Sequence, residues 1–370
     1  MEAQLLERKS IGIELNPLAI LISKVKTTQI DLNNLPEIYN NLYNNLYNDN
    51  LVYEIIDFKN IDFWFDKSSK KLLSKLLFAI NKIGDRNIRD FFSVCFSEIV
   101  REVSTCRHQG FKMHRDSDKI NKEWTIDQVH TMFFKVFKKN VQGLVEYQIA
   151  TSNKYNDAII ICGDARLNQK EIKKGSIDLI LTSPPYGDSH TTVAYGQFSR
   201  LSSQWLNLKN ENIKNIVGLD NELLGGRTID KDKELEILNK SHTLRGAKEI
   251  FDKRMENLTD DDLVKMGKRY REVISFYYDL ELSLKNGAEY LKQNKFFVLV
   301  TGSRVVKDIK LNTDIIIGEM GESLGLELQG ILYRNIINKR MPNRVSSTNI
   351  IGEISPTMTK ESIIILKKIG

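Results

Sequence analysis

Four consecutive residues, Ser183-Pro184-Pro185-Tyr186, carry the clearest chemical signal in the sequence. They follow Ser176–Thr182 (SIDLILT), an apolar run typical of a buried strand. Two successive prolines fix φ and remove two backbone donors, so the local carbonyls keep fixed directions as acceptors. Together with a hydroxyl and an aromatic ring, they can grip a planar group that bears an amine. The alternative interpretation is a rigid turn with a packed tyrosine.

Two acidic residues also stand where short apolar runs end. Glu14 closes the run Ser10–Leu15 (SIGIEL), and Asp164 follows Ala158–Cys162 (AIIIC). Ligands of parallel sheets bind beyond the carboxyl ends of the strands, where these two acids and Ser183 are expected to lie. The simpler alternatives are an exposed strand-end acid for Glu14 and a turn residue for Asp164.

Further elements are needed to position these residues. Three more apolar runs predict strands at Lys295–Thr301, Leu326–Ile336 and Glu361–Lys368. The periodicity from Ile61 to about Val145 is helical throughout, and another helix is predicted over Leu263–Leu291 with a bend at Asn286-Gly287. Strands that alternate with helices predict an α/β fold with a mostly parallel sheet.

Composition limits the class of protein. The 370 residues are 41% hydrophobic and 28% charged, which is typical of a globular protein, and the net charge of +6 permits a nucleic-acid partner without identifying one. The first ten residues lack the apolar segment of a secretory signal, so we expect a cytoplasmic location. The three cysteines are widely spaced and the histidines lack ligand spacing, so no disulfide framework and no metal are predicted.

The segment Thr182-Ser183-Pro184-Pro185-Tyr186 resembles the catalytic motif of the DNA amino-methyltransferases. These enzymes transfer a methyl group from S-adenosylmethionine to the exocyclic amine of cytosine (N4) or adenine (N6). Other segments resemble further motifs of the family or of its N4-cytosine-like branch: Gly12–Thr27, Phe91–Ser104, Gly163–Arg166, KFFVLVTGSRVV, NKRMPNR and TMTKESIIILKK. The resemblance spans nearly the whole chain. It implies a Rossmann-like S-adenosylmethionine-dependent methyltransferase sheet with a helical insertion.

The resemblance also implies roles for individual residues. Glu14 would accept the ribose hydroxyls of the cofactor, and Asp164 would accept from its adenine amino group. Ser183 and the Pro184 carbonyl would hold the target amine, and Tyr186 would stack on the flipped base. The implied cofactor-binding set is Glu14, Asn16, Asp164, Ala165 and Ser183, and the implied catalytic set is Ser183, Pro184, Pro185 and Tyr186.

The target base follows from the first residue of the motif. Serine in that position favours N4-cytosine, and N6-adenine is the alternative. Methylation at C5 of cytosine uses a cysteine that follows a proline in its own family, and no Pro-Cys dipeptide occurs here. Two other hypotheses remain: a non-catalytic DNA-binding subunit, and methylation of RNA or protein amines.

Contacts with double-stranded DNA are predicted from basic and aromatic residues. A basic stretch lies on and after the helix predicted at 91–105, and others follow the catalytic loop or flank Met341-Pro342. A solvated helix face explains the first stretch equally well. The candidates are Arg101, Arg107, Lys112, Arg115, Tyr195, Arg200, Lys339, Arg340 and Arg344.

One expected motif is missing from the sequence. The family has a glycine-rich cofactor motif after its first strand, just before the segment at which this chain begins. Two explanations are open: a small second polypeptide supplies the first strand and this motif, or the gene product is truncated. Our hypothesis is the second polypeptide, because everything downstream of the missing motif is intact. The predicted division is the start of the methyltransferase domain at 1–30, a helical insertion at 31–154, and the main methyltransferase domain at 155–370. Residues 187–260 form its variable, DNA-recognition segment.

Overall fold

The computed structural model describes residues 1–107, 113–120, 122–151, 157–187, 195–211, 213, 215–336, 344–345, 355–356 and 359–369. The chain divides into two compact units. The helical unit comprises residues 1–164 and 194–219, and the sheet unit comprises residues 165–193 and 220–370. Among the described residues, no helix combines the length and apolar character needed to cross a bilayer.

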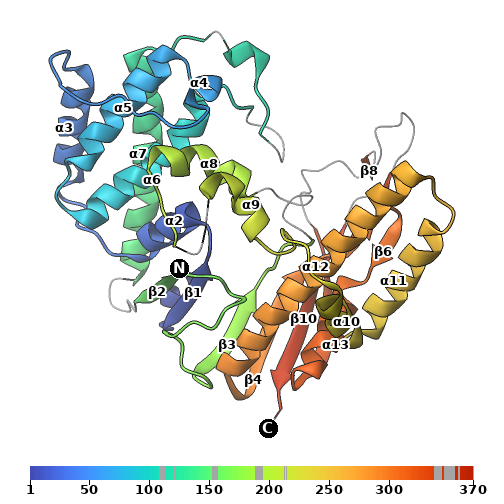
Figure 1. Cartoon of the computed structure of the whole chain (residues 1–370). Helices are drawn as coiled ribbons and strands as arrows, with labels where there is room; N and C mark the ends of the chain where they lie inside the picture. The colour runs from blue at the N-terminus through green and yellow to red at the C-terminus, as the bar shows by residue number, and fades with distance from the viewer. Residues whose placement is uncertain are drawn as a thin grey trace. The chain divides into compact units, whose positions relative to one another are not determined.

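The helical unit is built from helices that bury one apolar face each. Asp66 and Asp85 accept backbone N–H groups at the starts of the two central helices, which fixes where these begin. The helices are α1 (Glu2–Leu5), α2 (Pro17–Thr27), α3 (Leu35–Tyr47), α4 (Ile61–Trp64), α5 (Lys67–Asn81), α6 (Arg86–Val103), α7 (Ile126–Thr151) and α8 (Tyr195–Trp205), with single 3-10 turns at Ser117–Lys119 and Ile216–Gly218. Figure 1 shows the central helices side by side.

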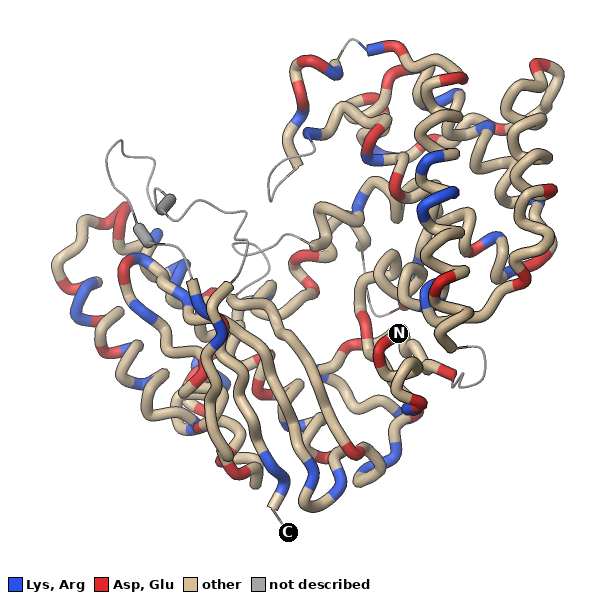
Figure 2. The backbone as a smooth tube through the Cα atoms, turned by 180° about the vertical axis from the view of Figure 1, so that it is seen from behind, with Lys and Arg blue, Asp and Glu red and all other residues tan. Residues whose placement is uncertain are grey.

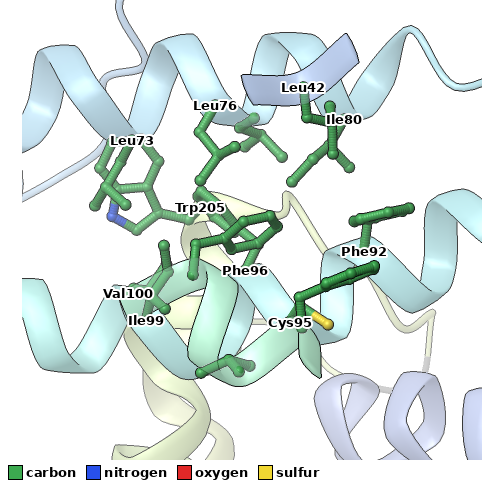
Figure 3. Packing of buried hydrophobic residues seen from close by; sticks show 14 of the residues in the cluster. Leu42, Leu73, Leu76, Ile80, Phe92, Cys95, Phe96, Ile99, Val100 and Trp205 are labelled. Carbon is green, nitrogen blue, oxygen red and sulfur yellow. The ribbon is translucent and has the colours of Figure 1, made fainter. Parts of the chain in front are cut away.

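Trp205 anchors α8 in the core of the helical unit. Its ring is 1% exposed and meets Phe65 edge-on, with ring centroids 5.4 Å apart. Figure 3 shows it among side chains of α5 and α6, including Leu73 and Phe96. The chain therefore returns to the helical unit soon after the Ser183–Tyr186 loop.

Two short strands pair in the helical unit. β1 (Ser10–Glu14) and β2 (Ala158–Cys162) run parallel, and the register sets Glu14 opposite Cys162. Because their carboxyl ends meet, Glu14 and the turn that begins at Gly163 share one edge. The Gly163 N–H donates to the Glu14 carbonyl at 3.0 Å.

The sheet unit contains four strands in the order β3-β4-β10-β7. β3 and β4 are parallel, and β10 runs antiparallel between β4 and β7. The strands of this unit are β3 (Ile177–Thr182), β4 (Leu291–Thr301), β7 (Leu326–Asn335) and β10 (Lys360–Lys368), with the hairpin of β5 (Arg304–Val306) and β6 (Ile309–Leu311) and the short pair of β8 (Arg344–Val345) and β9 (Ser355–Pro356).

Helices cover one face of this sheet (Figure 1). They are α10 (Lys231–Asn239), α11 (His242–Met255), α12 (Asp260–Tyr290) and α13 (Thr313–Ser323), preceded by the single turn α9 (Leu219–Glu222). Phe297 and Leu299 of β4 join Ile364 and Leu366 of β10 in the core beneath these helices. Gly287 lets α12 approach the sheet, because a Cβ there would lie 2.4 Å from the Phe297 ring.

The structure is a mixed α/β fold, as the sequence predicts. The prediction of a mostly parallel sheet is wrong for the four-stranded sheet, because β10 runs antiparallel to both of its neighbours. Two further differences concern the helices. The stretch 61–145 is not helical throughout: α6 ends at Val103, and an isolated bridge joins Cys106 to Arg115 before α7 begins. The helix at 263–291 is not interrupted at Asn286-Gly287, and α12 continues to Tyr290. Gly287 serves close helix–sheet packing there.

Candidate active site

The Ser183–Tyr186 loop leaves the sheet at the carboxyl end of β3. Pro184 is buried, whereas Ser183 is exposed. The Ser183 hydroxyl donates to the Val300 carbonyl of β4 at 3.1 Å. A hydroxyl that donates its proton in this way keeps its oxygen lone pairs as acceptors. Ser183 is therefore held as a hydrogen-bond acceptor beside a rigid proline pair.

Tyr186 is held by two residues that the sequence did not single out. Its hydroxyl donates to Glu361 Oε1 at 2.8 Å. Arg334 Nε in turn donates to the other oxygen of Glu361 at 3.1 Å, and its terminal nitrogen forms an ion pair with the same oxygen. Burial and the bond to Glu361 raise the pKa of Tyr186 to about 12. The phenol therefore stays protonated and its ring orientation is fixed.

The partners of Tyr186 come from the far end of the chain. Glu361 lies on β10 and Arg334 on β7, two strands that pair with each other. The hydrogen bond from Arg334, aided by that from Tyr186, lowers the pKa of Glu361. The sequence placed Glu361 at the start of a predicted strand and within the segment TMTKESIIILKK, and neither signal linked it to the loop.

Glu14 and Asn16 stand at the edge shared by β1 and β2. The Asn16 N–H donates to Glu14 Oε1 at 2.8 Å, which orients the carboxylate and leaves its second oxygen for another donor. The Asn16 side chain caps α2 by accepting from the Leu18 N–H and donates to the Ser199 hydroxyl. It is 8% exposed, so its side chain holds α2 and α8 together. Contact of Asn16 with a cofactor stays a prediction.

Asp164 and Ala165 follow β2, and the division between the two units falls between them. The Ala165 carbonyl accepts from Asn286 at 2.9 Å. The next residue, Arg166, forms a largely buried ion pair with Asp279 of α12 at 2.9 Å and also donates to the Glu222 carbonyl. Both partners of Arg166 lie in the sheet unit, to which Arg166 itself belongs.

The structure places the predicted DNA-contacting residues in three ways. Arg101, which is half-buried, lies over the Phe198 ring at 4.1 Å, and Arg115, which is exposed, lies over the Phe63 ring at 4.6 Å. Arg200 donates to the Val217 carbonyl at 2.8 Å. Tyr195 is exposed at the start of α8, and Arg107 is exposed after α6. Lys112, Lys339 and Arg340 lie outside the described residues, and of Arg344 only the backbone, in β8, is described.

Two lysines that the sequence did not single out line a cavity in the sheet unit. The cavity has a volume of about 330 Å³ and is lined by Ser303, Lys310, Asn312, Asp314, Ile315, Tyr333 and Lys360. Lys360 and Glu361 begin β10, whose Ser362 pairs with Thr301 at the end of β4. The cavity and the support of Tyr186 therefore share the edge of the sheet at which β3 and β4 end.

Comparison with known proteins supplies the family. Over 369 aligned residues the chain is 36% identical to the Type II methyltransferase M.MvaI of Kocuria varians, and the match takes in 96% of this chain and 79% of that protein. The chain belongs to the type II methyltransferases. No protein-family model matches the sequence, and no solved structure matches it.

The match to the Kocuria varians protein covers both units of this chain. The similarity therefore includes the helical core as well as the sheet with the Ser183–Tyr186 loop. The Kocuria varians protein is the longer of the two, because about a fifth of its length lies outside the match.

Proposed function

We propose that this chain methylates the exocyclic N4 amine of cytosine in duplex DNA, with S-adenosylmethionine as methyl donor, within a restriction–modification system. The observation that carries the proposal is the Ser183 hydroxyl. Its proton is donated to the Val300 carbonyl, which leaves its oxygen available to a substrate as an acceptor. An aromatic amine has two N–H groups to donate, and cytosine N4 is such an amine.

Acceptors at the loop would lower the barrier to methyl transfer. The amine lone pair is conjugated with the base ring and must become available before it can attack. When Ser183 and the Pro184 carbonyl accept the two N–H groups, they draw the nitrogen toward tetrahedral geometry, and these bonds strengthen as positive charge develops. No covalent intermediate with the protein is needed.

Tyr186 would receive the flipped base. A base inside the duplex is out of reach of the loop, so it must leave the stack at a cost of a few kcal/mol. An aromatic platform restores part of the lost stacking. The bond from Tyr186 to Glu361, which is itself held by Arg334, fixes the ring before substrate arrives. The Tyr186 side chain would then lose little conformational freedom when the base binds.

The residues at the carboxyl edge of β1 and β2 fit the proposed cofactor. The Asn16 N–H holds one oxygen of Glu14, and the second oxygen is suited to accept a ribose hydroxyl. S-adenosylmethionine, when bound, supplies an electrophilic methyl group on a sulfonium. Asp164, after the paired strand, is the proposed acceptor for the adenine amino group. Ala165 follows it in the same turn.

The proposed partners are double-stranded DNA and a second polypeptide. Exposed Arg107 and Tyr195, together with Lys310 and Lys360 at the cavity, are the described candidates for DNA contact. The second polypeptide would supply the first strand and the glycine-rich motif of the Rossmann-like sheet. Activity would then depend on co-expression.

The target base is tested by mass analysis of methylated DNA. The chain is co-expressed with the products of the neighbouring reading frames and incubated with DNA and S-adenosylmethionine. The DNA is then digested to nucleosides. N4-methylcytosine is the expected product. N6-methyladenine would support the alternative target, and DNA binding without any methylated base would support a non-catalytic subunit.

Cofactor binding is tested separately by calorimetry on the co-expressed complex without DNA. Glu14→Gln should weaken S-adenosylmethionine binding at least tenfold, because the neutral amide accepts ribose hydroxyls less strongly. Glu37→Gln, an exposed change on α3 of the same unit, serves as the control. Equal affinities for both variants would contradict the assignment of Glu14.

A further inference from the structure

The hairpin of β5 and β6 carries an arginine on its buried face. Figure 2 marks charged residues along the backbone, and four of the eight residues in this hairpin are among them: Arg304, Lys307, Asp308 and Lys310. Residues directly opposite each other on paired strands share a face. The register sets Arg304 opposite Leu311, which is 1% exposed, and Lys310 opposite the exposed Val305. Of the two charged strand residues, only Arg304 therefore lies on the buried face.

The hairpin is a rigid support for Arg304. Val306 and Ile309, on the same face, belong to the core of the sheet unit. Between the strands, φ is 50° at Lys307 and 59° at Asp308, the left-handed backbone that a two-residue hairpin turn requires. Arg254 of α11 donates to the Lys307 carbonyl at 2.6 Å and ties this turn to the helix. Core packing and this hydrogen bond together fix the hairpin.

From this support Arg304 reaches the residue that follows Tyr186. Gly187 is buried, and a Cβ in its place would lie 2.6 Å from both Cδ and Cζ of Arg304. Cβ atoms essentially never approach other heavy atoms so closely, so the arginine fills the space that any other residue at 187 would need. Burial raises the pKa of Tyr277 on α12 to about 12, and the nearby charge of Arg304 acts against this rise. The guanidinium therefore points inward.

The Ser183–Tyr186 loop is contacted at both of its ends by one stretch of chain. At the first end, the Ser183 hydroxyl donates to the Val300 carbonyl. At the last, Arg304 lies against Gly187. Arg304 follows Val300 by only four residues, across the end of β4. The passage from β4 into the hairpin thus sets where the loop begins and where it ends.

We propose that Arg304 is a positioning residue, which lies across Gly187 and fixes the carboxyl end of the catalytic loop, an inference that rests on the proposed function. Methyl transfer requires the acceptors of the loop to meet the amine in one geometry, and a misplacement of about 1 Å can cost about 10²-fold in rate. The two prolines stiffen the loop, so a shift at one end is carried to the other. Arg304 acts through the loop and not on the reacting atoms.

The experiment alters both sides of the contact, singly and together. Arg304→Ala removes the side chain, Gly187→Ala forces it aside, and the double variant leaves nothing to displace. Single-turnover methylation by the co-expressed complex is counted as total methyl groups transferred to DNA, at limiting and at saturating DNA and cofactor. Arg254→Ala is the matched control, because it removes an arginine that holds the same hairpin at its turn. Circular dichroism confirms that the variants fold.

Each single substitution should slow methyl transfer about 10²-fold, and the loss should persist at saturating DNA and cofactor. The double variant should be no slower than Arg304→Ala, because both substitutions break one contact. Arg254→Ala should stay within about threefold of wild type. Additive losses in the double variant, equal losses in Arg304→Ala and Arg254→Ala, or a loss that saturation removes would overturn the proposal.

Hydrogen exchange separates this proposal from the proposed function. Without DNA, peptides that contain Gly187 should exchange faster in Arg304→Ala than in wild type, and Arg254→Ala should not show this change. If wild type methylates no base, the proposed function fails, while faster exchange would still support the contact of Arg304 with the loop. Methylated cytosine together with unchanged exchange and rate in Arg304→Ala would leave the function standing and refute the role of Arg304.

Discussion

At the scale of single residues, two hydroxyl hydrogen bonds hold the loop after β3. Ser183 gives its proton to the Val300 carbonyl, and Tyr186 gives its own to Glu361. The first hydrogen bond leaves the Ser183 oxygen as an acceptor, and the second holds the Tyr186 ring. Each can be removed by one conservative substitution.

Ser183→Ala should lower the methylation rate about 10² to 10³-fold, the usual effect of losing one hydrogen-bonding group that acts in the transition state. Affinity for S-adenosylmethionine is measured alongside the rate, because Ser183 also belongs to the implied cofactor-binding set. Single-turnover methylation measures the rate. Ser176→Ala, at the other end of β3, is the control: its hydroxyl donates to the Lys173 carbonyl at 2.6 Å. Equal rates for the two variants would contradict the role of Ser183.

Glu361→Gln should reduce stability at neutral pH and lose this effect in acid. The pKa of Glu361 is lowered from its ordinary value of 4.5, so the stabilisation from its carboxylate is present above that value. It disappears as pH falls through the lowered folded-state pKa. Urea unfolding at several pH values should therefore show wild type and variant converging only in strong acid. Glu327→Gln, exposed on β7, should show no such convergence, and a constant gap for Glu361→Gln would contradict the linkage.

At the scale of elements, the sequence predicted which segments are strands but not how they pair. Each apolar run among residues 158–162, 176–182, 295–301, 326–336 and 361–368 contains a strand. A run of apolar residues reports burial and not neighbours, so the place of β10 between β4 and β7 was not foreseeable. For the same reason Ser183 and Tyr186 could be proposed from their local motif, whereas Glu361, 175 residues from Tyr186, could not.

The turn after β2 provides a test at this scale. Arg166→Ala should destabilise the sheet unit by about 3 kcal/mol or more, because it leaves the carboxylate of Asp279 without its largely buried cation. Arg269→Ala, which removes a more exposed pair with Glu272 on α12, should cost under about 1 kcal/mol. Denaturant unfolding followed by far-UV circular dichroism measures the free energy of unfolding of both variants. Similar losses would show that burial of the Arg166 pair is energetically unimportant.

At the scale of the whole molecule, the Ser183–Tyr186 loop connects an element of the sheet unit to an element of the helical unit. Before it, β3 belongs to the sheet unit, and after it α8 belongs to the helical unit. Secondary-structure patterns could not have indicated this, because α8 is amphipathic in either setting. Its assignment depends on where Trp205 is buried.

Trp205→Ala should therefore destabilise the helical unit. Removal of a fully buried tryptophan costs about 3–5 kcal/mol. Hydrogen exchange should show lost protection in α5, α6 and α8, while amides of β10 keep theirs. Trp124→Ala, a partly buried tryptophan at the margin of the same core, is the milder comparison. Loss of protection in β10 equal to that in α6 would contradict the division of the chain.

The chain passes from one unit to the other at three junctions, near residues 164, 193 and 219. No single cut in the gene can therefore separate the units. The helical unit would have to be exchanged between related enzymes as a discontinuous cassette, with residues 1–164 and 194–219 moved together. Recombination that swaps only a terminal block would join halves of two different helical cores. In such chimaeras α8 of one parent would meet α5 and α6 of the other, so they should fold only where the Trp205 pocket is compatible.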